Sequence, residues 1–210
     1  MKHVNQSGEV WIFAEQEDGA IADIPLELLG KGRELADRLG VPLGAVLMGN
    51  GVEPLAATLF AHGADRIHLL NHPLLARYQT ATYAKTLIAA IEACQPQICL
   101  FGATPIGRDL APTVASALRC GLTADCTDLA IGDYADPVSK ETFPNLLLQV
   151  RPAFGGNIIA TIVNPRDWPQ MATVREGVMR PLPPDPSRTG EIVRHTCAVC
   201  PPLSYTPPPL

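Results

Sequence analysis

One arginine, Arg151, stands where its side chain could act on a bound molecule. It belongs to the segment Gln-Val-Arg-Pro-Ala-Phe-Gly-Gly-Asn at 149–157, in which a strand runs into a turn. Glycine and asparagine adopt positive φ at little cost, so this segment predicts a hairpin whose second strand leaves over 158–163. An arginine near the end of such a hairpin can project a planar, permanently charged group. The commoner alternative is an arginine that pairs with a nearby carboxylate on an ordinary hairpin.

A second segment, at 102–112, lies at the junction of a predicted strand and a predicted helix. Gly102 and Gly107 allow close backbone approach, and free N–H groups at a helix start suit an anion or a carbonyl-rich ring. Asp109 would complement the positive end of the helix dipole. Pro112 is tolerated if the helix begins near Gly107, because it then falls in the first turn. The spacing is neither a Walker loop nor a dinucleotide fingerprint, so a well-capped turn without a ligand fits equally well.

The cysteine and histidine residues predict no metal site. Cys197 and Cys200 form one Cys-x-x-Cys pair, but zinc needs four ligands and no second pair stands at a suitable spacing. A redox role would need this motif at a helix start, whereas it lies in a proline-rich stretch. We therefore interpret the pair as having no role. His62, His68 and His72 share no helical face and are typical of element ends.

Acid–base and hydrolytic chemistry has little support in the sequence. Glu15, Glu17 and Asp18 follow the first predicted strand and could act as acid or base groups, but a solvated loop is the commoner case. A Gly-x-Ser-x-Gly elbow and a His-Glu-x-x-His motif are both absent from the sequence. The motifs of the common hydrolases are therefore missing.

Short apolar runs alternate with helical patterns over residues 9–120, and they must form the frame that positions these segments. The predicted strands are 9–14, 41–48, 66–70 and 97–102, and the predicted helices are 28–39, 53–61, 76–93 and 108–118. Helices between strands imply right-handed crossovers and a parallel sheet that is buried on both faces. This predicts a doubly wound, Rossmann-like α/β fold. Ligands in such sheets lie beyond the carboxyl ends of the strands, here the loops after Ala14, Met48, Leu70 and Gly102.

The remainder of the chain has a different character. Residues 121–175 consist of extended segments and turns, so we expect an antiparallel strand extension beside the parallel sheet. Residues 171–174 predict an edge strand that is ended by Gly177. Residues 181–210 hold 9 of the 21 prolines and show no periodicity, which is typical of an extended tail or linker. These patterns predict one α/β domain over 1–192 and a proline-rich tail over 193–210.

The composition excludes several classes of protein. Of the 210 residues, 47% are hydrophobic and 18% are charged, so the chain can bury a core and is not globally disordered. A net charge of −5 argues against nucleic acid as the main partner. No apolar run approaches the roughly 20 residues that cross a bilayer. The start lacks a signal or transit pattern, so we expect a cytoplasmic location. Four of the six cysteines lie in apolar or helical segments, where cysteine is usually a small buried hydrophobe rather than part of a disulfide framework.

Five segments, taken together and in this order, resemble the alpha subunit of electron-transferring flavoproteins. They are Val-Trp-Ile-Phe-Ala-Glu at 10–15, Gly-Arg-Asp-Leu-Ala-Pro at 107–112, Gly-Leu-Thr-Ala-Asp-Cys-Thr at 121–127, Arg-Pro-Ala-Phe-Gly-Gly-Asn at 151–157 and Pro-Gln-Met-Ala-Thr-Val-Arg at 169–175. The resemblance is to the amino-terminal domain of that family, whose fold is of the adenine-nucleotide alpha-hydrolase type, and it covers roughly residues 9–192. The form at 151–157 looks more like the bacterial and archaeal branch that includes electron-bifurcating members.

The resemblance implies an electron-carrier subunit that is not a self-contained catalyst. In this family the domain packs against a beta subunit, and in the bifurcating branch an FAD held mainly by that subunit lies at the junction. AMP takes this place in the other branch. The arginine matching Arg151 approaches the flavin ring near N5, where a fixed guanidinium favours negative charge on the reduced ring. The cofactor-binding residues that the resemblance implies are Arg151, Phe154, Gly155, Asn157, Gly107 and Arg108.

The resemblance further implies an acyl-CoA or other flavin dehydrogenase as redox partner, and a place in fatty acid beta-oxidation. The sequence departs from the family in two ways. Glu176 stands where the family usually has proline, and nothing after Glu191 matches the carboxyl-terminal FAD domain. We therefore expect a piece of a longer chain or a natural short relative, and we expect that it does not bind the alpha-subunit FAD stably alone.

Two other functions are open at this point. The first is a stand-alone adenine-nucleotide-binding module of the same fold. Such a module carries a Gly-x-x-Gly-x9-Gly-Ser/Thr loop after the fourth strand, whereas here Gly102 and Gly107 stand at that place without the later Gly-Ser/Thr. The second is an interaction domain without a ligand, which persists after the loss of a partner domain.

Overall fold

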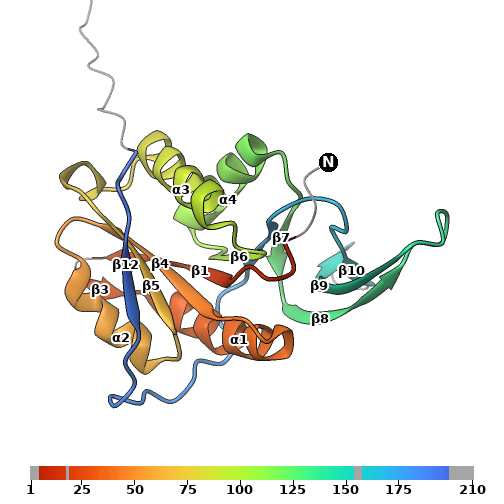
Figure 1. The fold of residues 1–210 in the computed structure, drawn as a ribbon, viewed down its shortest axis with the longest axis horizontal. Coiled ribbons are helices and arrows are strands. Elements are labelled where there is room, and N and C mark those ends of the chain that lie inside the picture. Colours follow the sequence, from red (N-terminus) through yellow and green to blue (C-terminus); the bar gives the residue numbers. More distant parts are fainter. Residues whose placement is uncertain (1–4, 18, 154–157, 199–210) are drawn as a thin grey trace, which may run out of the picture.

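A seven-stranded sheet with helices on both faces forms the centre of the computed structural model, which describes residues 5–17, 19–153 and 158–198 (Figure 1). The strand order is β12-β5-β4-β1-β6-β11-β7, and every neighbouring pair runs parallel. The strands are β1 (Val10–Ala14), β4 (Leu43–Gly49), β5 (Arg66–Asn71), β6 (Ile98–Gly102), β7 (Leu122–Cys126), β11 (Gln170–Val174) and β12 (Glu191–Arg194). The prediction of a doubly wound α/β fold is confirmed.

The helices lie in two layers. α1 (Asp23–Leu39) and α2 (Ala56–Ala61) cover one face of the sheet, and α3 (Thr80–Cys94) and α4 (Pro105–Leu118) cover the other (Figure 1). Short 3-10 turns at Glu53–Leu55 and Pro73–Leu75 precede α2 and α3, and a small hairpin joins β2 (Gln16–Glu17) to β3 (Ala20–Ile21). The chain reverses its direction across the sheet between β5 and β6. The topological switch point therefore lies beyond the carboxyl ends of β1 and β6.

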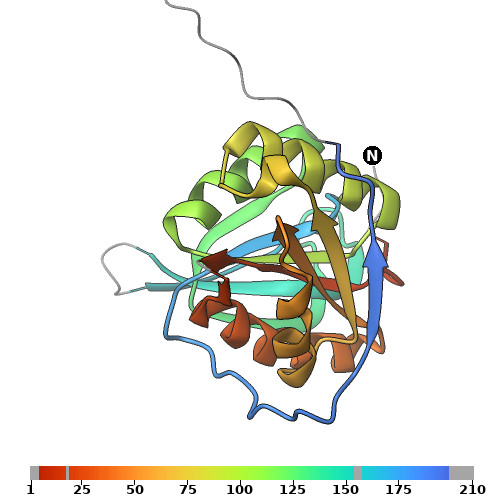
Figure 2. The ribbon, with the colours of Figure 1, turned by 90° about the vertical axis from the view of Figure 1, so that its left-hand side faces the viewer.

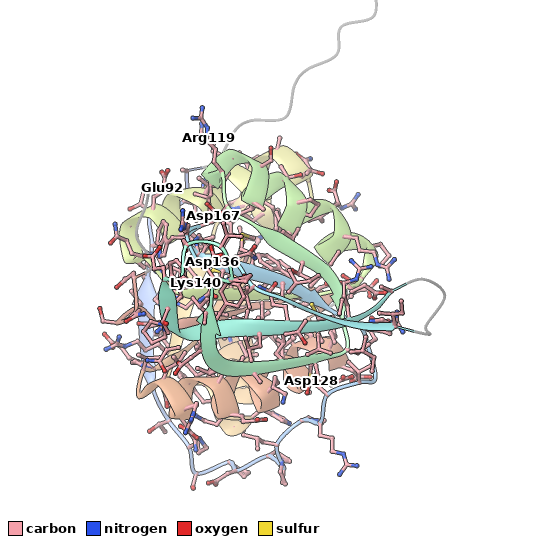
Figure 3. All side chains as sticks on the ribbon, turned by 90° about the vertical axis from the view of Figure 1, so that its right-hand side faces the viewer. Glu92, Arg119, Asp128, Asp136, Lys140 and Asp167 are labelled. Carbon is pink, nitrogen blue, oxygen red and sulfur yellow. The ribbon has the colours of Figure 1, made fainter. Side chains whose placement is uncertain are left out.

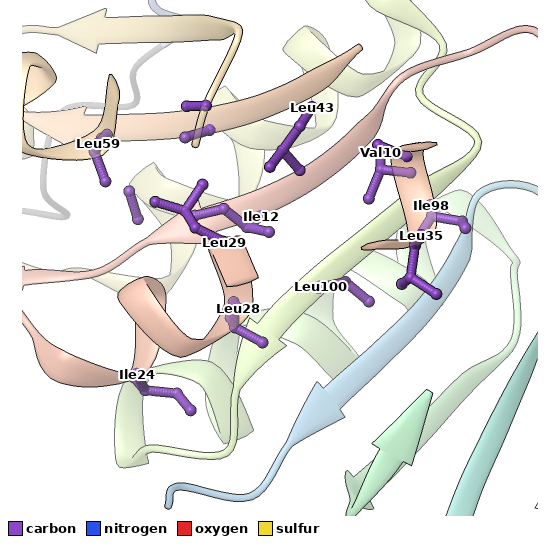
Figure 4. Close-up of a cluster of buried hydrophobic side chains, with 14 of the residues drawn as sticks. Val10, Ile12, Ile24, Leu28, Leu29, Leu35, Leu43, Leu59, Ile98 and Leu100 are labelled. Atoms are coloured by element: carbon purple, nitrogen blue, oxygen red, sulfur yellow. The ribbon is translucent and has the colours of Figure 1, made fainter. Parts of the chain in front are cut away.

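Apolar side chains hold each helical layer to the sheet. Figure 4 shows the layer under α1, where Leu28, Leu29 and Leu35 meet Ile12 and Leu100 of the strands. Leu28 and Leu35 are seven residues apart, so they share one face of the helix. Full burial of one such leucine stabilises the fold by roughly 1.5–3 kcal/mol. A second apolar layer lies between the sheet and the α3–α4 pair. Within the part of the chain that the structure describes, none of the helices is both long and apolar enough to cross a bilayer.

The expected antiparallel extension is a three-stranded sheet of order β10-β9-β8 beside the main sheet (Figures 1 and 3). Its strands are β8 (Asp128–Ala135), β9 (Thr142–Ala153) and β10 (Ile158–Ile162). β9 and β10 pair from Ala153 opposite Ile158 to Gln149 opposite Ile162, so the predicted hairpin is confirmed. Its turn residues, 154–157, lie outside the described residues.

β12 is a strand that no pattern in the sequence predicts. This strand pairs in parallel with residues 66–69 of β5 and forms one edge of the main sheet. The segment before it runs along the outside of α1 and α2 (Figure 2). A Cβ at Gly30 of α1 would lie 2.1 Å from the carbonyl oxygen of Arg180, so this close approach requires glycine. The first two residues assigned to the tail, Val193 and Arg194, therefore belong to the sheet.

Two local predictions are wrong. β11 lies between β6 and β7 with all its residues buried, so it is an internal strand and not an edge strand. α4 begins at Pro105 with Thr104 as its N-cap, which places Pro112 inside the helix and not in its first turn. Asp109 consequently lies in the second turn, where it accepts hydrogen bonds from the hydroxyls of Tyr78 and Thr80. The two errors have different causes. Tertiary packing decides which strands are neighbours. The start of α4 follows from a local signal, a threonine N-cap followed by proline at the first helical position.

Candidate functional site

Arg151 lies near the end of β9, opposite Ala160 on β10. The residue is half-buried, and it forms no hydrogen bond or ion pair with any other residue that the structure describes. Its charge nevertheless acts on the neighbouring strand β7. The pKa of Asp125 is lowered by a hydrogen bond from Arg175 and, to a smaller extent, by nearby guanidinium charges that include Arg151. The guanidinium of Arg151 therefore lies close enough to Asp125 to act on it through its charge, without a hydrogen bond to any of the described residues.

Asp125 is fixed between two further arginines. Arg175 donates to it twice, from Nη2 to Oδ2 at 2.6 Å and from Nε to Oδ1 at 3.3 Å. Arg108 brings its Nη2 to 3.7 Å from Oδ1. The backbone of Asp125 has a φ of 62°, a left-handed conformation that aspartate tolerates better than most residues, and its N–H donates to Thr173 Oγ1 at 2.9 Å. The carboxylate is thus held in one direction.

We call Arg108, Arg151, Arg175 and Asp125 the arginine cluster. Arg108 follows β6 on α4, Asp125 is the penultimate residue of β7 and Arg175 directly follows β11, so these three come from the carboxyl ends of adjacent parallel strands. Arg151 reaches the same place from the antiparallel sheet. Three guanidinium groups against one carboxylate leave two positive charges uncompensated within the cluster. Such a surface suits an anion or a ring that acquires negative charge.

Gly107 has a role within the fold. Its N–H donates to the hydroxyl of Thr104 at 2.9 Å and caps α4. A Cβ at this position would lie 1.9 Å from the carbonyl oxygen of Gly102, so the turn admits only glycine. The geometry of Gly107 matches a well-capped turn, and its N–H is already used. Its assignment to a cofactor stays a prediction, as does that of Arg108, whose Nε also donates to the carbonyl oxygen of Ala103 at 2.6 Å.

The structure brings together two of the six predicted cofactor-binding residues, Arg151 and Arg108. Phe154, Gly155 and Asn157 lie outside the described residues. Sequence reasoning missed Asp125 and Arg175 as site residues, although both stand in segments that carry the family resemblance. The signal that could have identified them is their position directly at strand ends.

A separate cavity of about 500 Å³ lies beyond the carboxyl ends of β1, β4 and β6, where the topology predicts a ligand site. Its wall includes Glu15 and Glu17. Glu15 accepts a hydrogen bond from the hydroxyl of Thr104 at 2.6 Å, and burial raises the pKa of Glu15. The wall also includes Arg77, so two carboxylates face one guanidinium and the lining has no excess of positive charge for a phosphate group. This balance of charge gives the stand-alone adenine-nucleotide module no support.

The histidines and cysteines depart in part from expectation. His62 and His72 cap short helices, as predicted, but His68 is buried inside β5. Cys99 and Cys126 are buried as expected, whereas Cys94 is exposed at the end of α3. All of the cysteines that the structure describes are free thiols: Cys94, Cys99, Cys120, Cys126 and Cys197.

The chain matches one protein family model and several curated relatives. A family model described as "Electron transfer flavoprotein domain" matches residues 10–199. The chain is 46% identical to the electron transfer flavoprotein subunit alpha of Thermoanaerobacterium thermosaccharolyticum over 191 residues, which are 91% of this chain and 55% of that protein. It is 43% identical to FixB of Rhizobium meliloti over 190 residues, 89% of this chain and 51% of that protein.

A third relative is the acryloyl-CoA reductase electron transfer subunit beta of Anaerotignum propionicum. It is 42% identical over 190 residues, which cover 84% of this chain and 52% of that protein. The chain thus spans about half the length of the curated relatives that it matches.

Proposed function

Because the chain belongs to the electron transfer flavoprotein domain family, we propose that it acts as the amino-terminal domain of an alpha subunit that docks a beta subunit and helps to form a flavin site. The relatives are named as electron transfer subunits, not as catalysts. The observation that carries the proposal is the arginine cluster, in which the half-buried Arg151 has no hydrogen-bond partner among the described residues.

The chemistry of the arginine cluster fits a flavin. A bound flavin supplies the ring that accepts and donates electrons, and its reduced form carries more negative charge. Arg151 would place a positive charge beside the ring, and Arg108 would add a second positive charge at the same edge of the domain. Both stabilise the reduced ring and so raise its potential. Asp125 has the opposite effect on the potential, and it also orients Arg175.

The antiparallel sheet supplies a surface for the beta subunit. β10 is an edge strand, and its Ile158 and Ile159 are 53% and 74% exposed. Exposed β-branched residues on a sheet edge are typical of an interface that a partner covers. Ile159 lies opposite Pro152, the residue after Arg151. Docking over β10 would therefore bring a flavin held mainly by the beta subunit next to the arginine cluster.

AMP is the second ligand that this family places at the junction. The positive charge of the arginine cluster would also complement its phosphate. The redox partner is proposed to be an acyl-CoA or related flavin dehydrogenase, for which the name of the acryloyl-CoA reductase relative is the support. A place in fatty acid beta-oxidation stays a prediction, and the relatives named FixB leave other pathways open.

The test is a redox titration of the complex reconstituted with a beta subunit. Arg151→Ala is expected to lower the flavin midpoint potential by at least about 30 mV, which corresponds to about 1.4 kcal/mol for a two-electron couple. Arg38→Ala, an exposed residue at the far end of α1, serves as the matched control and should leave the potential unchanged. Equal potentials in all three proteins would exclude a role of Arg151 at the flavin. Bound AMP without a junction flavin would instead assign the cluster to the phosphate.

A further inference from the structure

Three metal-ligating side chains from distant parts of the chain meet on the α3 side of the sheet. They are His68 in β5, Cys94 at the end of α3 and His195 directly after β12. One ligand atom from each residue lies within 4.8 Å of the other two. His68 and His195 are 127 residues apart in the sequence, so no local sequence motif indicates that they lie together.

His68 is already oriented as a metal ligand. Its Nε2 lies 2.8 Å from Glu9 Oε2, so a proton on Nε2 is held by the carboxylate and the lone pair of Nδ1 points toward His195. Glu9 is held in turn by Arg66 Nη1 at 2.6 Å and by Trp11 Nε1 at 2.8 Å. A carboxylate that fixes the tautomer and direction of a ligating histidine is the common outer partner in zinc sites.

The donor set limits the class of metal. Two imidazole nitrogens and one thiolate suit Zn²⁺ or copper, whereas Mg²⁺ and Ca²⁺ require oxygen ligands. Three protein ligands with water in the fourth position are the common tetrahedral arrangement of Zn²⁺. Zinc–ligand bonds of about 2.0–2.3 Å place tetrahedral ligand atoms roughly 3.3–3.6 Å apart. His68 Nδ1 and His195 Nε2 are 2.9 Å apart, so a slight separation of the rings admits the ion. Cys94 is exposed and can rotate its thiol inward.

We propose that His68, Cys94 and His195 form a site for Zn²⁺, with Glu9 as the outer partner of His68 and water in the fourth position. The site lies toward the amino ends of the strands, because Glu9 precedes β1 and Cys94 precedes β6. The arginine cluster is at the opposite end of the sheet, so this inference does not rest on the proposed flavin site.

Zinc at this place would fasten the end of the described chain to the domain. β12 is a four-residue edge strand that forms its backbone pairs with β5 alone, and His195 follows it directly. One Zn²⁺ ion bound by His195, His68 and Cys94 would connect β12 with both β5 and α3. Metal binding to the folded form alone raises the stability of the fold by mass action.

The direct hydrogen bond between His68 and His195 is the competing state, because a proton can take the place of the ion. The test is therefore a titration of the chelator-treated chain with Co²⁺, a spectroscopic substitute for Zn²⁺, followed by displacement with Zn²⁺. One equivalent of Co²⁺ is expected to bind with a thiolate-to-metal absorption band that Zn²⁺ abolishes. Zn²⁺ should also raise the midpoint of thermal unfolding.

Substitutions of single residues test which side chains bind the metal. Cys94→Ser and His195→Gln should lower the metal affinity by more than about 100-fold, and Glu9→Gln by about 10- to 100-fold, the usual effect of losing an outer partner. His62→Gln, a control at a partly exposed histidine outside the cluster, should bind as the wild type does. The double variant Cys197→Ser/Cys200→Ser tests the rival cysteine pair and should also retain the affinity. Circular dichroism of each variant reports whether the fold is intact.

Three results would overturn the proposal. They are the absence of binding in the folded wild-type chain, unchanged affinity in folded Cys94→Ser, and loss of binding in the Cys197→Ser/Cys200→Ser variant with retention in Cys94→Ser. If His195→Gln fails to fold, the comparison of Cys94→Ser with the wild type decides the matter, because Cys94 is exposed and its replacement leaves the core unchanged.

Discussion

Arg175 and Asp125 form a two-point ion pair between the carboxyl ends of β11 and β7, with Nη2–Oδ2 and Nε–Oδ1 distances of 2.6 Å and 3.3 Å. Their side chains are 47% and 29% exposed, so solvent screens the attraction and the pair adds little to stability. Its importance is geometric. Arg175 fixes the direction of the Asp125 carboxylate. Among the described residues Arg151 forms no hydrogen bond with this carboxylate and acts on it through its charge alone.

The charge of Asp125 gives a first prediction. Asp125→Asn removes a negative charge, and asparagine tolerates the φ of 62° at this position, so the backbone is retained. The flavin potential of the reconstituted complex is expected to rise by roughly 30 mV, opposite in sign to the effect of Arg151→Ala. Redox titration of both variants measures the two shifts. Shifts of the same sign would show that the cluster acts through structure and not through charge.

Glu15 gives a prediction about pH. Burial raises its pKa above the usual 4.5, so the folded state binds the proton more tightly than the unfolded state does. Stability is then fully present below about pH 4.5 and falls as pH rises through the folded pKa. Glu15→Gln keeps an acceptor for Thr104 and removes the charge, so its urea midpoint should exceed that of the wild type at pH 7 and match it at pH 4.

The exposed neighbour Glu17 provides the control for this experiment. Glu17→Gln removes the same formal charge at the same end of the sheet, and it should shift the midpoint little at either pH. If the urea midpoint of Glu15→Gln is no higher than that of the wild type at pH 7, the negative charge of Glu15 does not destabilise the folded state.

Gly107 tests packing against cofactor binding. Gly107→Ala places a methyl group 1.9 Å from the carbonyl oxygen of Gly102, and such overpacking is expected to lower the free energy of unfolding by about 1–3 kcal/mol. Ser116→Ala, on the exposed side of the same helix, should change it by less than about 0.5 kcal/mol. Urea unfolding measures both. A full flavin content in folded Gly107→Ala complexes would confine the residue to packing, and an empty but stable complex would contradict this.

The periodic part of the fold could be predicted from sequence because its signals are local. Leu28 and Leu35 repeat at helical spacing, and runs such as Ile-Cys-Leu-Phe at 98–101 are long enough to mark buried strands. β12 could not be predicted this way. Its four residues follow a proline-rich stretch, and they form a strand because β5 offers an open edge for pairing. The position of β11 inside the sheet is likewise decided by its neighbours.

In the candidate site, too, some features follow from local sequence signals and others depend on tertiary structure. Arg151 and Arg108 were identified because they stand in recognisable motifs. Their convergence with Asp125 and Arg175 depends on the strand order, in which β11 lies between β6 and β7, and no periodicity encodes that order. The sequence therefore predicted individual residues of the site, and tertiary structure was needed to show which of them share one carboxylate.

The cysteines give a prediction about reactivity. Cys126 is fully buried, and burial raises its pKa to about 12. Partial burial and the charge of Glu9 also raise the pKa of Cys94, but this residue is exposed to the reagent. Because the thiolate is the reactive form, iodoacetamide at pH 8 should label Cys94 at least about 100-fold faster than Cys126. Mass spectrometry of timed digests measures the two rates. Comparable rates in the native protein would mean that β7 opens readily from the sheet, and equal labelling is expected only in denaturant.

The exposed edge of β10 gives the last prediction. Ile159 is 74% exposed, so Ile159→Lys should leave the unfolding midpoint of the isolated chain within experimental error. If a beta subunit covers this strand, the variant loses the burial of an isoleucine, worth roughly 1.5–3 kcal/mol, which corresponds to an affinity at least about 10-fold lower. Titration calorimetry with the beta subunit measures the affinity.

Val138 is the matched control for this surface. It is 89% exposed in the turn between β8 and β9, at the end of the antiparallel sheet away from the arginine cluster. Val138→Lys adds the same charge to the same sheet, so a general electrostatic effect on docking would weaken both variants alike. Weakening by Ile159→Lys alone places the interface over β10, because contact area and not net charge then decides the affinity. Unchanged affinity in both variants would require the beta subunit to dock elsewhere, and Arg151 would then have no flavin to face.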